Sequence, residues 1–182
     1  MTRGDQPEQM ARILDTLPYG EVIVWDNSRL DDLKTAGRYA AMLEASNDVV
    51  YFQDDDTLFT DHDGLMRWFV PGTITANYGH GDNDGGYGDL PLVCGGGLAD
   101  RGAVWNGMRR YRSEPLWDWP PDDLYYADFA IGVLTPFVHT PFQFEINLPI
   151  AQHESRLCNQ PWAAAAKARV TARARTIRDA PV

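Results

Sequence analysis

The sequence predicts an α/β fold with a mostly parallel central sheet flanked by helices, and three observations support this class. Its 182 residues are 44% hydrophobic, which is enough for one packed core and too little for two ordinary domains. Two short runs, residues 21–25 (EVIVW) and 49–52 (VVYF), are rich in the β-branched residues of strands buried on both faces. A segment with apolar residues at helical spacing precedes each run, and this alternation is typical of right-handed, doubly wound α/β units.

The first half of the chain predicts helix, strand, helix and strand in that order. A helix is expected over residues 7–17, where Asp5 and Glu8 have the spacing of a capping box. A second helix is expected over residues 33–43, where apolar residues recur every three or four positions.

The second half predicts shorter elements. Its expected helices are residues 65–69, 101–111, 122–134 and 162–178, and its expected strands are 73–76 and 92–94. Residues 77–89 are glycine-rich and without periodicity, which predicts either a mobile lid over a ligand or a flexible surface loop.

Charge and composition exclude several classes of protein. The chain has 16 basic and 26 acidic residues and a formal net charge of −10, which disfavours binding to nucleic acid or to an anionic membrane surface. It has neither an apolar run of about 18 residues nor an apolar signal-peptide core, so we expect a cytoplasmic protein without a membrane span. Its cysteines, Cys94 and Cys158, set no disulfide framework and are expected to be reduced.

Three successive carboxylates, Asp54, Asp55 and Asp56, follow the expected strand at residues 49–52. Ligands bind at the carboxyl ends of strands in open α/β sheets, and adjacent carboxylates repel one another unless a cation lies between them. In an extended chain Asp54 and Asp56 point to the same side, so they could share a hard divalent ion such as Mn²⁺ or Mg²⁺. The alternative is a solvated acidic turn without a ligand.

Residues 21–59 resemble the nucleotide-binding half of glycosyltransferases with the GT-A fold, and the segment NLPIAQHESRLCNQPWAAAAKARV near the end of the chain resembles the closing segment of short bacterial and phage members. The segments that carry the resemblance are EVIVWDNSRL and AGRYAAMLEASNDVVYFQDDDTLF, the second of which contains a D-x-D motif. The resemblance implies one GT-A-like domain over residues 1–182, with a nucleotide- and metal-binding half (1–60), an acceptor and catalytic half (61–150) and a C-terminal segment and helix (151–182). It also implies transfer of a sugar from a nucleoside-diphosphate sugar donor to a glycan, protein or small-molecule acceptor.

The resemblance also implies roles for individual residues. Mn²⁺ or Mg²⁺ would be held by Asp54 and Asp56, with His153 as a third ligand and His139 as a less favoured candidate; a lone histidine is equally consistent with a structural role. Substrate contacts are implied for Arg3, Asp26, Asn27, Arg38, Asp55, Gly96 and Gly97.

An inverting transfer needs a carboxylate that accepts the proton of the acceptor hydroxyl. Asp123, with Asp122 beside it, matches the acidic pair that opens a helix in the second half of this family, and Asp128 is the reserve candidate. Acidic residues at a helix start are also favoured by the helix dipole alone.

Two other functions remain open at this point. A degenerate transferase-like domain would bind a nucleotide or glycan without catalysis. A Mg²⁺-dependent phosphoryl-transfer enzyme would need a phosphate-binding loop, and Lys34 and Lys167 are the only lysines. Because a GT-A sheet begins with a strand ahead of its first helix, and only residues 1–6 precede that helix here, we also expect the first strand to be missing.

Overall fold

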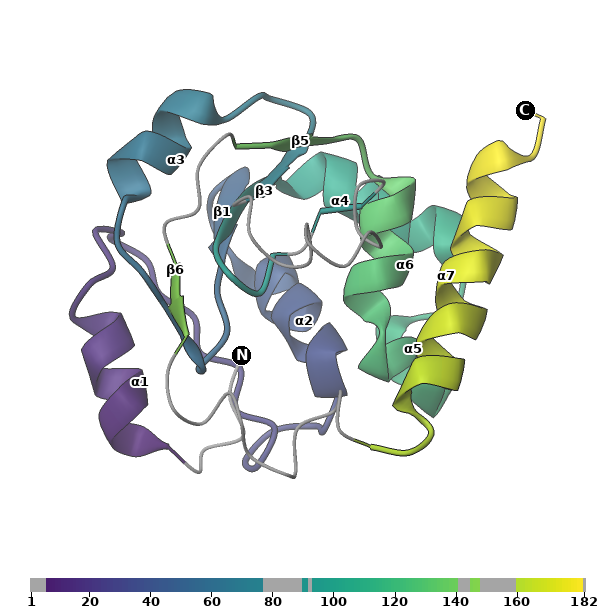
Figure 1. Ribbon diagram of the computed structural model, residues 1–182, viewed down its shortest axis with the longest axis horizontal. Helices are drawn as coiled ribbons and strands as arrows, with labels where there is room; N and C mark the ends of the chain where they lie inside the picture. Colours follow the sequence, from purple (N-terminus) through teal and green to yellow (C-terminus); the bar gives the residue numbers. More distant parts are fainter. Residues whose placement is uncertain (1–5, 77–89, 92, 141–144, 148–159, 182) are drawn as a thin grey trace.

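The computed structural model describes residues 6–76, 90–91, 93–140, 145–147 and 160–181. It has a mixed α/β architecture (Figure 1). The helices are α1 (Pro7–Leu14), α2 (Gly37–Glu44), α3 (His62–Trp68), α4 (Arg101–Tyr111), α5 (Pro121–Tyr125), α6 (Ala127–Leu134) and α7 (Ala163–Asp179), with 3-10 turns η1 (Lys34–Ala36) and η3 (Leu116–Asp118). The strands are β1 (Val49–Phe52), β2 (Thr57–Phe59), β3 (Ile74–Ala76), β4 (Gly97–Asp100), β5 (Phe137–His139) and β6 (Glu145–Asn147).

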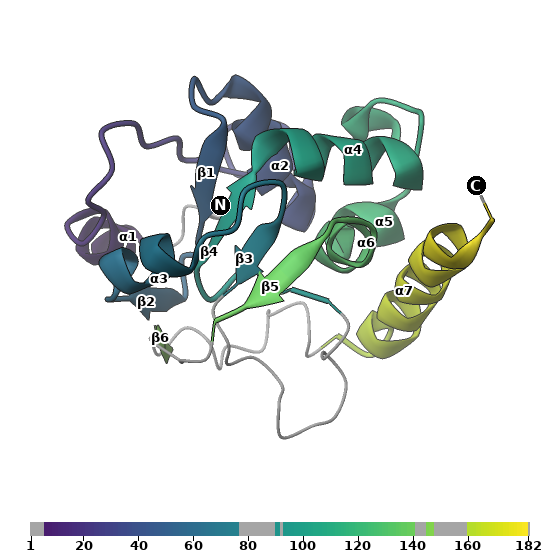
Figure 2. The same ribbon diagram turned by 90° about the horizontal axis from the view of Figure 1, so that it is seen from above.

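The main sheet has four strands in the order β1-β4-β3-β5, which Figure 2 shows side by side. β4 runs antiparallel to both of its neighbours, and only β3 and β5 pair in parallel. The prediction of a mostly parallel sheet is therefore wrong. β4 has the sequence Gly-Leu-Ala-Asp, which carries no β-branched signal of its own, and it pairs with a strand on each side.

Two runs predicted as strands do not enter the sheet. Residues 21–25 take no strand assignment, and Val22 and Val24 are 46% and 40% exposed, so this part of the expected doubly wound unit is not formed. Residues 93 and 94 lie in the turn before β4 rather than in a strand. A second, two-stranded sheet pairs β2 with β6 in antiparallel register.

The helices follow the sequence periodicity more closely. α4 has the predicted bounds, and its N-cap residue Asp100 accepts a hydrogen bond from Ala103 N at 2.9 Å. α1 ends three residues earlier than predicted. The helix expected over residues 122–134 is divided into α5 and α6 at Tyr126, whose φ and ψ of −119° and 28° are not helical.

The core lies between the main sheet and helices α2, α4 and α6, with α7 packed beside α6 on the outside (Figure 1). Tyr39, Phe52, Val104 and Ile131 are at most 5% exposed, and burying a large side chain to this extent stabilises a fold by about 1.5–3 kcal/mol. Over the described part of the chain, no helix has both the length and the apolar character needed to cross a membrane.

Candidate functional site

The acidic turn, residues 54–56, is held in place by hydrogen bonds of its first residue and of the residues just ahead of it. Asp54 N donates to Cys94 O at 3.1 Å, which ties the turn to the segment ahead of β4. Gln53 Nε2 donates to Thr57 O, and Tyr51 Oη donates to Gln53 Oε1, both at 2.6 Å. These bonds close the chain between β1 and β2, so the carboxylates lie where β1 ends, as the sequence predicts.

Arg38 is the buried cation beside this turn. Its side chain leaves the first turn of α2 and is 3% exposed. Nη2 lies 2.6 Å from Asp54 Oδ1 and 3.3 Å from Asp128 Oδ2, and Nε donates to Thr35 O at 3.3 Å. Nη1 is also buried and finds no hydrogen-bond partner among the described residues. Arg38 therefore joins the first residue of the D-x-D motif to a carboxylate 74 positions later in α6.

Asp128 is the second carboxylate of this group and is 7% exposed. Tyr39 Oη donates to its Oδ1 at 2.8 Å. Burial raises the pKa of Asp128 above its usual value, although the neighbouring Arg38 opposes the rise. Burial raises the pKa of the Cys94 thiol well above its usual value too, and the nearby Asp54 adds to this effect. We call Arg38, Tyr39, Asp54, Cys94 and Asp128 the Arg38 cluster.

The net charge of this cluster, taken together with the two aspartates that follow Asp54, is negative and favours the binding of a cation. One guanidinium faces the two carboxylates of Asp54 and Asp128, and Asp55 and Asp56 follow directly in the chain. Burial alone would lower the pKa of Arg38, but the two carboxylates outweigh burial and raise it, so the guanidinium stays charged. The formal charge of the four aspartates and Arg38 is therefore −3, which a divalent cation would partly neutralise.

A groove of about 590 Å³ includes Arg38 and Asp54 among its lining residues. Its other walls come from α1, residues 17–25, α2 and β1, and they are mostly apolar. The acidic end of β1 is thus next to a hollow of the size that small-molecule sites have.

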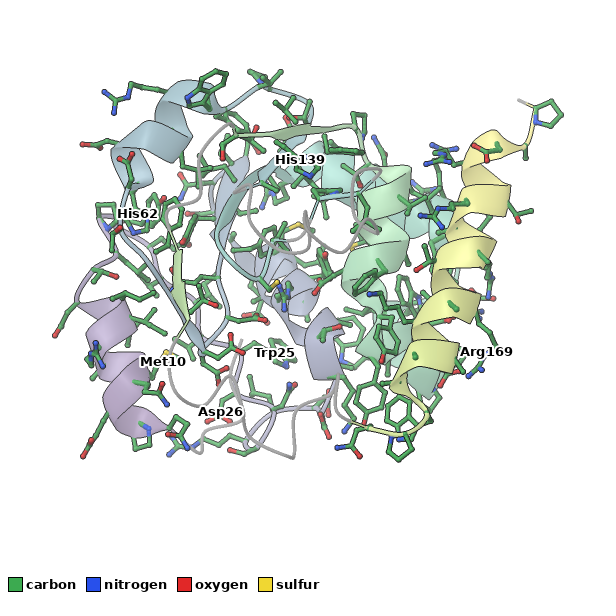
Figure 3. All side chains as sticks on the ribbon, viewed as in Figure 1. Met10, Trp25, Asp26, His62, His139 and Arg169 are labelled. Atoms are coloured by element: carbon green, nitrogen blue, oxygen red, sulfur yellow. The ribbon has the colours of Figure 1, made fainter. Side chains whose placement is uncertain are left out.

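Asp26 and Asn27 shape a loop beside Trp25, which Figure 3 labels next to Asp26. Asp26 Oδ1 accepts from Ser28 N at 2.9 Å and from Ser28 Oγ at 2.6 Å, and these hydrogen bonds lower the pKa of the carboxyl. Asn27 Nδ2 donates to Lys34 O at 3.1 Å. Their predicted contacts with a nucleoside remain predictions.

Gly96, directly ahead of β4, and Gly97, the first residue of β4, both lie close to other side chains. Gly96 has a φ of +106°, and a Cβ there would lie 2.8 Å from Phe59 Cδ2. A Cβ at Gly97 would lie 3.3 Å from Val93 Cγ1. What the two glycines contact is therefore the protein's own core, and their predicted contact with a sugar remains a prediction.

Asp123, predicted as the catalytic base, contacts a tyrosine and two arginines that are not members of the Arg38 cluster. Its carboxylate accepts from Tyr111 Oη at 2.9 Å and from Arg112 Nε, and Arg173 Nη1 of α7 lies 3.7 Å away. Asp122 pairs with Arg169, which Figure 3 labels on α7. These contacts join α4, α5 and α7, and among the described residues neither aspartate forms a hydrogen bond or an ion pair with the Arg38 cluster.

The histidines do not complete a metal site among the described residues. His139 Nε2 lies 3.2 Å from Leu90 O. His153 and Arg3 lie outside the described residues, as does the loop at 77–89. In the described ranges, no group of three histidine, cysteine or acidic side chains is placed to hold a metal ion.

His62, labelled in Figure 3, is a polar residue in an aromatic contact that the sequence did not indicate. Its Nδ1 lies 3.2 Å from Tyr19 Oη, and its ring is within 5.4 Å of the rings of Tyr19, Tyr51 and Phe59. Burial lowers the pKa of His62. Burial, and to a smaller extent the charge of Asp63, raises the pKa of Tyr19 to about 12. The aromatic residues are scattered in sequence, so no spacing could have indicated this contact.

Comparison with models of known protein families gave no match, and neither the curated proteins nor the solved structures contained a match to the chain.

Proposed function

We propose that this protein is a metal-dependent glycosyltransferase that moves a sugar from a nucleoside-diphosphate sugar to a hydroxyl acceptor. The observation that carries the proposal is the Arg38 cluster, in which the first aspartate of the D-x-D motif and a buried aspartate of α6 share one guanidinium. The groove lined by Arg38 and Asp54 supports the proposal because it offers space for a small-molecule donor beside these charges.

The donor set fits Mn²⁺ or Mg²⁺. Asp54 and Asp56 supply carboxylate oxygens, the ligands that these hard cations prefer. Mg²⁺ is commonly held by one or two carboxylates together with substrate phosphates and water, so two protein ligands are sufficient. When bound, the ion would neutralise the charge that develops on the departing diphosphate.

Asp128 is the better candidate for the general base, and this changes the assignment made from the sequence. In an inverting transfer the acceptor oxygen forms a bond to the anomeric carbon, the bond from that carbon to the diphosphate breaks, and the hydroxyl proton passes to the base. Burial raises the pKa of Asp128 above its usual value, and a higher pKa makes a carboxylate a stronger proton acceptor. Asp128 shares the guanidinium of Arg38 with Asp54 of the D-x-D motif, whereas Asp123 contacts Tyr111, Arg112 and Arg173 instead.

Tyr39 and Arg38 would orient the base. Tyr39 donates to Oδ1 and Arg38 pairs with Oδ2, so the carboxylate of Asp128 is held at both oxygens. Such anchoring fixes the direction in which the proton is accepted, and general bases contribute about 10²–10⁴ in rate when so positioned.

The test is slow hydrolysis of sugar nucleotides in the presence of Mn²⁺ and without acceptor. UDP-, GDP-, CDP-, ADP- and dTDP-glucose are incubated with the protein, and release of the nucleoside diphosphate is measured. We expect at least one donor to be hydrolysed, the rate to vanish with EDTA, and Asp128→Asn to lower it by about 10²-fold or more.

Asp123→Asn is the matched control for the base. It removes the same charge from a helix of the same half of the chain, and we expect it to lower the unfolding midpoint while leaving hydrolysis by the folded protein within about threefold of wild type. Loss of hydrolysis in Asp123→Asn with full activity in Asp128→Asn would return the role to Asp123. Binding of a donor without any turnover would instead favour the degenerate, non-catalytic domain.

A further inference from the structure

Exposed aromatic rings lie where residues 31–34, η3, α5 and the start of α7 meet. Trp117 of η3 is 49% exposed and Trp162, directly ahead of α7, is 39% exposed, whereas Trp119 is 4% exposed. The ring of Trp162 lies 4.9 Å from the ring of Tyr125 in α5, and Figure 1 shows α5 beside the first turns of α7. The two exposed tryptophans are therefore not core residues, and they present ring surface to the solvent.

Charged side chains of residues 31–34 connect these rings. Trp117 Nε1 donates to Asp31 Oδ2 at 3.0 Å. Lys34 Nζ forms an ion pair with Asp32 and lies 5.4 Å from the centre of the Tyr125 ring. The contacts thus run from Trp117 through residues 31–34 to α5 and the start of α7. We call the six residues that take part the aromatic platform: Asp31, Asp32, Lys34, Trp117, Tyr125 and Trp162.

The backbone at Lys34 is held in an unusual conformation. Its φ is +55°, in the left-handed region that residues other than glycine rarely adopt. Asn27 Nδ2 donates to Lys34 O at 3.1 Å, and Lys34 N donates to Asp32 Oδ1 at 3.4 Å. Thr35 Oγ1 donates to Tyr125 O at 2.8 Å, which ties this corner to α5. The ammonium group and the rings are therefore arranged before a ligand binds.

Thr35 also connects the aromatic platform to the Arg38 cluster. Its hydroxyl donates to the carbonyl oxygen of Tyr125, and its own carbonyl oxygen accepts from Arg38 Nε at 3.3 Å. One residue thus stands between the platform and the guanidinium that pairs with Asp54 and Asp128. The platform therefore adjoins the charges that the proposed function uses.

The combination of rings and charges suits a sugar better than a protein partner. The face of an aromatic ring is negative, and the C–H bonds on one face of a sugar ring present partial positive charge to it. Sugar hydroxyls can donate to the exposed carboxylates of Asp31 and Asp32 and accept from the ammonium group of Lys34. The core of a protein interface, by contrast, is depleted in charged residues. Two carboxylates and one ammonium group carry a net charge of −1, which favours a neutral sugar over an anionic one.

We propose that the aromatic platform binds a neutral oligosaccharide and that this oligosaccharide is the acceptor of the transfer reaction. Tyr125 and Trp162 stack against one sugar ring and Trp117 against another, so the ligand has at least two rings. One of its hydroxyl oxygens forms the bond to the anomeric carbon of the donor, its proton passes to Asp128, and the diphosphate leaves with the electron pair of the broken bond. The role as acceptor rests on the proposed function, whereas the binding of the oligosaccharide does not.

The test measures glycan binding in EDTA and without a sugar nucleotide. The biotinylated full chain is assembled on streptavidin, so that several copies strengthen a weak interaction, and is applied to an array of microbial, plant and animal glycans. We expect it to bind neutral oligosaccharides of two or more rings. The strongest of these is then titrated into the free protein, and tryptophan fluorescence gives the Kd. Binding to no glycan of the array, or to anionic glycans alone, would overturn the proposal.

Substitutions of exposed tryptophans locate the bound glycan. Trp162→Ala and Trp117→Ala each remove one stacking ring and are expected to raise the Kd by about 3- to 10-fold, while Trp162→Phe keeps a ring and should retain most of the affinity. Trp105→Ala is the matched control, because it removes a tryptophan of similar exposure, 41%, from α4, and it should leave the Kd unchanged. The thermal midpoint shows that each variant is folded. A Kd that is the same in wild type, Trp162→Ala and Trp117→Ala would contradict this location.

The outcomes separate this proposal from the proposed function. Glycan binding that depends on Trp162, in a protein that hydrolyses no sugar nucleotide, supports the platform and refutes the transferase. Hydrolysis of a sugar nucleotide without binding to any glycan refutes the platform and leaves the transferase. In a transfer assay with the bound glycan as acceptor, Trp162→Ala is expected to raise the KM for the glycan by the same factor as the Kd, and an unchanged KM would overturn the role as acceptor.

Discussion

Replacement of Arg38 tests the Arg38 cluster most severely. Arg38→Gln keeps a polar side chain but leaves the carboxylates of Asp54 and Asp128 without their shared cation. Removing one partner of a buried ion pair costs about 3–5 kcal/mol, because the remaining charge stays desolvated. We expect this loss in the free energy of unfolding at pH 7.

The loss should depend on pH in a definite direction. The folded-state pKa of Asp128 is already raised, so its contribution to stability is fully present below the unfolded-state pKa of about 3.9 and is lost as the pH rises through the folded value. Without Arg38 the folded-state pKa rises further, and the loss of stability extends to higher pH. The destabilisation by Arg38→Gln should therefore be smaller at pH 4.5 than at pH 7.

Urea unfolding followed by tryptophan fluorescence at both pH values measures this difference. Arg110→Gln, at an exposed position near the end of α4, is the matched control and should change the free energy by about 0.5 kcal/mol or less. The double variant Arg38→Gln/Asp128→Asn should regain part of the loss, because the Asp128 side chain is then neutral and only the carboxylate of Asp54 is left without its cation. Equal destabilisation at pH 4.5 and pH 7, or a loss no larger than in Arg110→Gln, would refute the reasoning.

Three further predictions follow from the same region. Tyr39→Phe removes the hydrogen bond to Asp128 and should lower the free energy of unfolding by about 1.5–3 kcal/mol, a loss that Asp128→Asn in the same chain should reduce. Gly96→Ala forces a side chain onto a φ of +106° and against Phe59, so its thermal midpoint should fall by several degrees, whereas Gly20→Ala, with no atom within 4 Å of the added Cβ, should leave it nearly unchanged. Because the pKa of Cys94 is raised, iodoacetamide at pH 8 should modify it far more slowly in the folded protein than in urea, and equal rates by mass spectrometry would contradict the raised pKa of this thiol.

Local signals predicted the elements that depend on local contacts. The helix predicted over residues 101–111 is α4 with the same bounds, and the β-branched run at 49–52 is β1. A helix is stabilised by contacts three and four residues apart, so its pattern is visible in the sequence. The acidic turn could be placed because it directly follows the run of β1 in the sequence.

Non-local contacts decided the parts that the sequence did not predict. Residues 21–25 have the composition of a strand, but strand formation depends on a neighbour with which to pair, and they enter neither described sheet. β4 joins the sheet because Gly97 and Ala99 fit between β1 and β3, which no propensity indicates. The choice between Asp123 and Asp128 depended on Arg38 and on arginines from α4 and α7, far apart in the chain.

The proposed function depends most directly on joint binding of a divalent cation and a nucleoside diphosphate. Calorimetric titration of the protein with UDP, GDP, CDP, ADP and dTDP, each with and without Mn²⁺, measures it. We predict saturable heat for at least one diphosphate only when Mn²⁺ is present, loss of that heat in Asp56→Ala, and no loss in Asp63→Ala, which removes an exposed aspartate from α3. Absence of heat with every diphosphate, or equal heat in Asp56→Ala and wild type, would contradict the account.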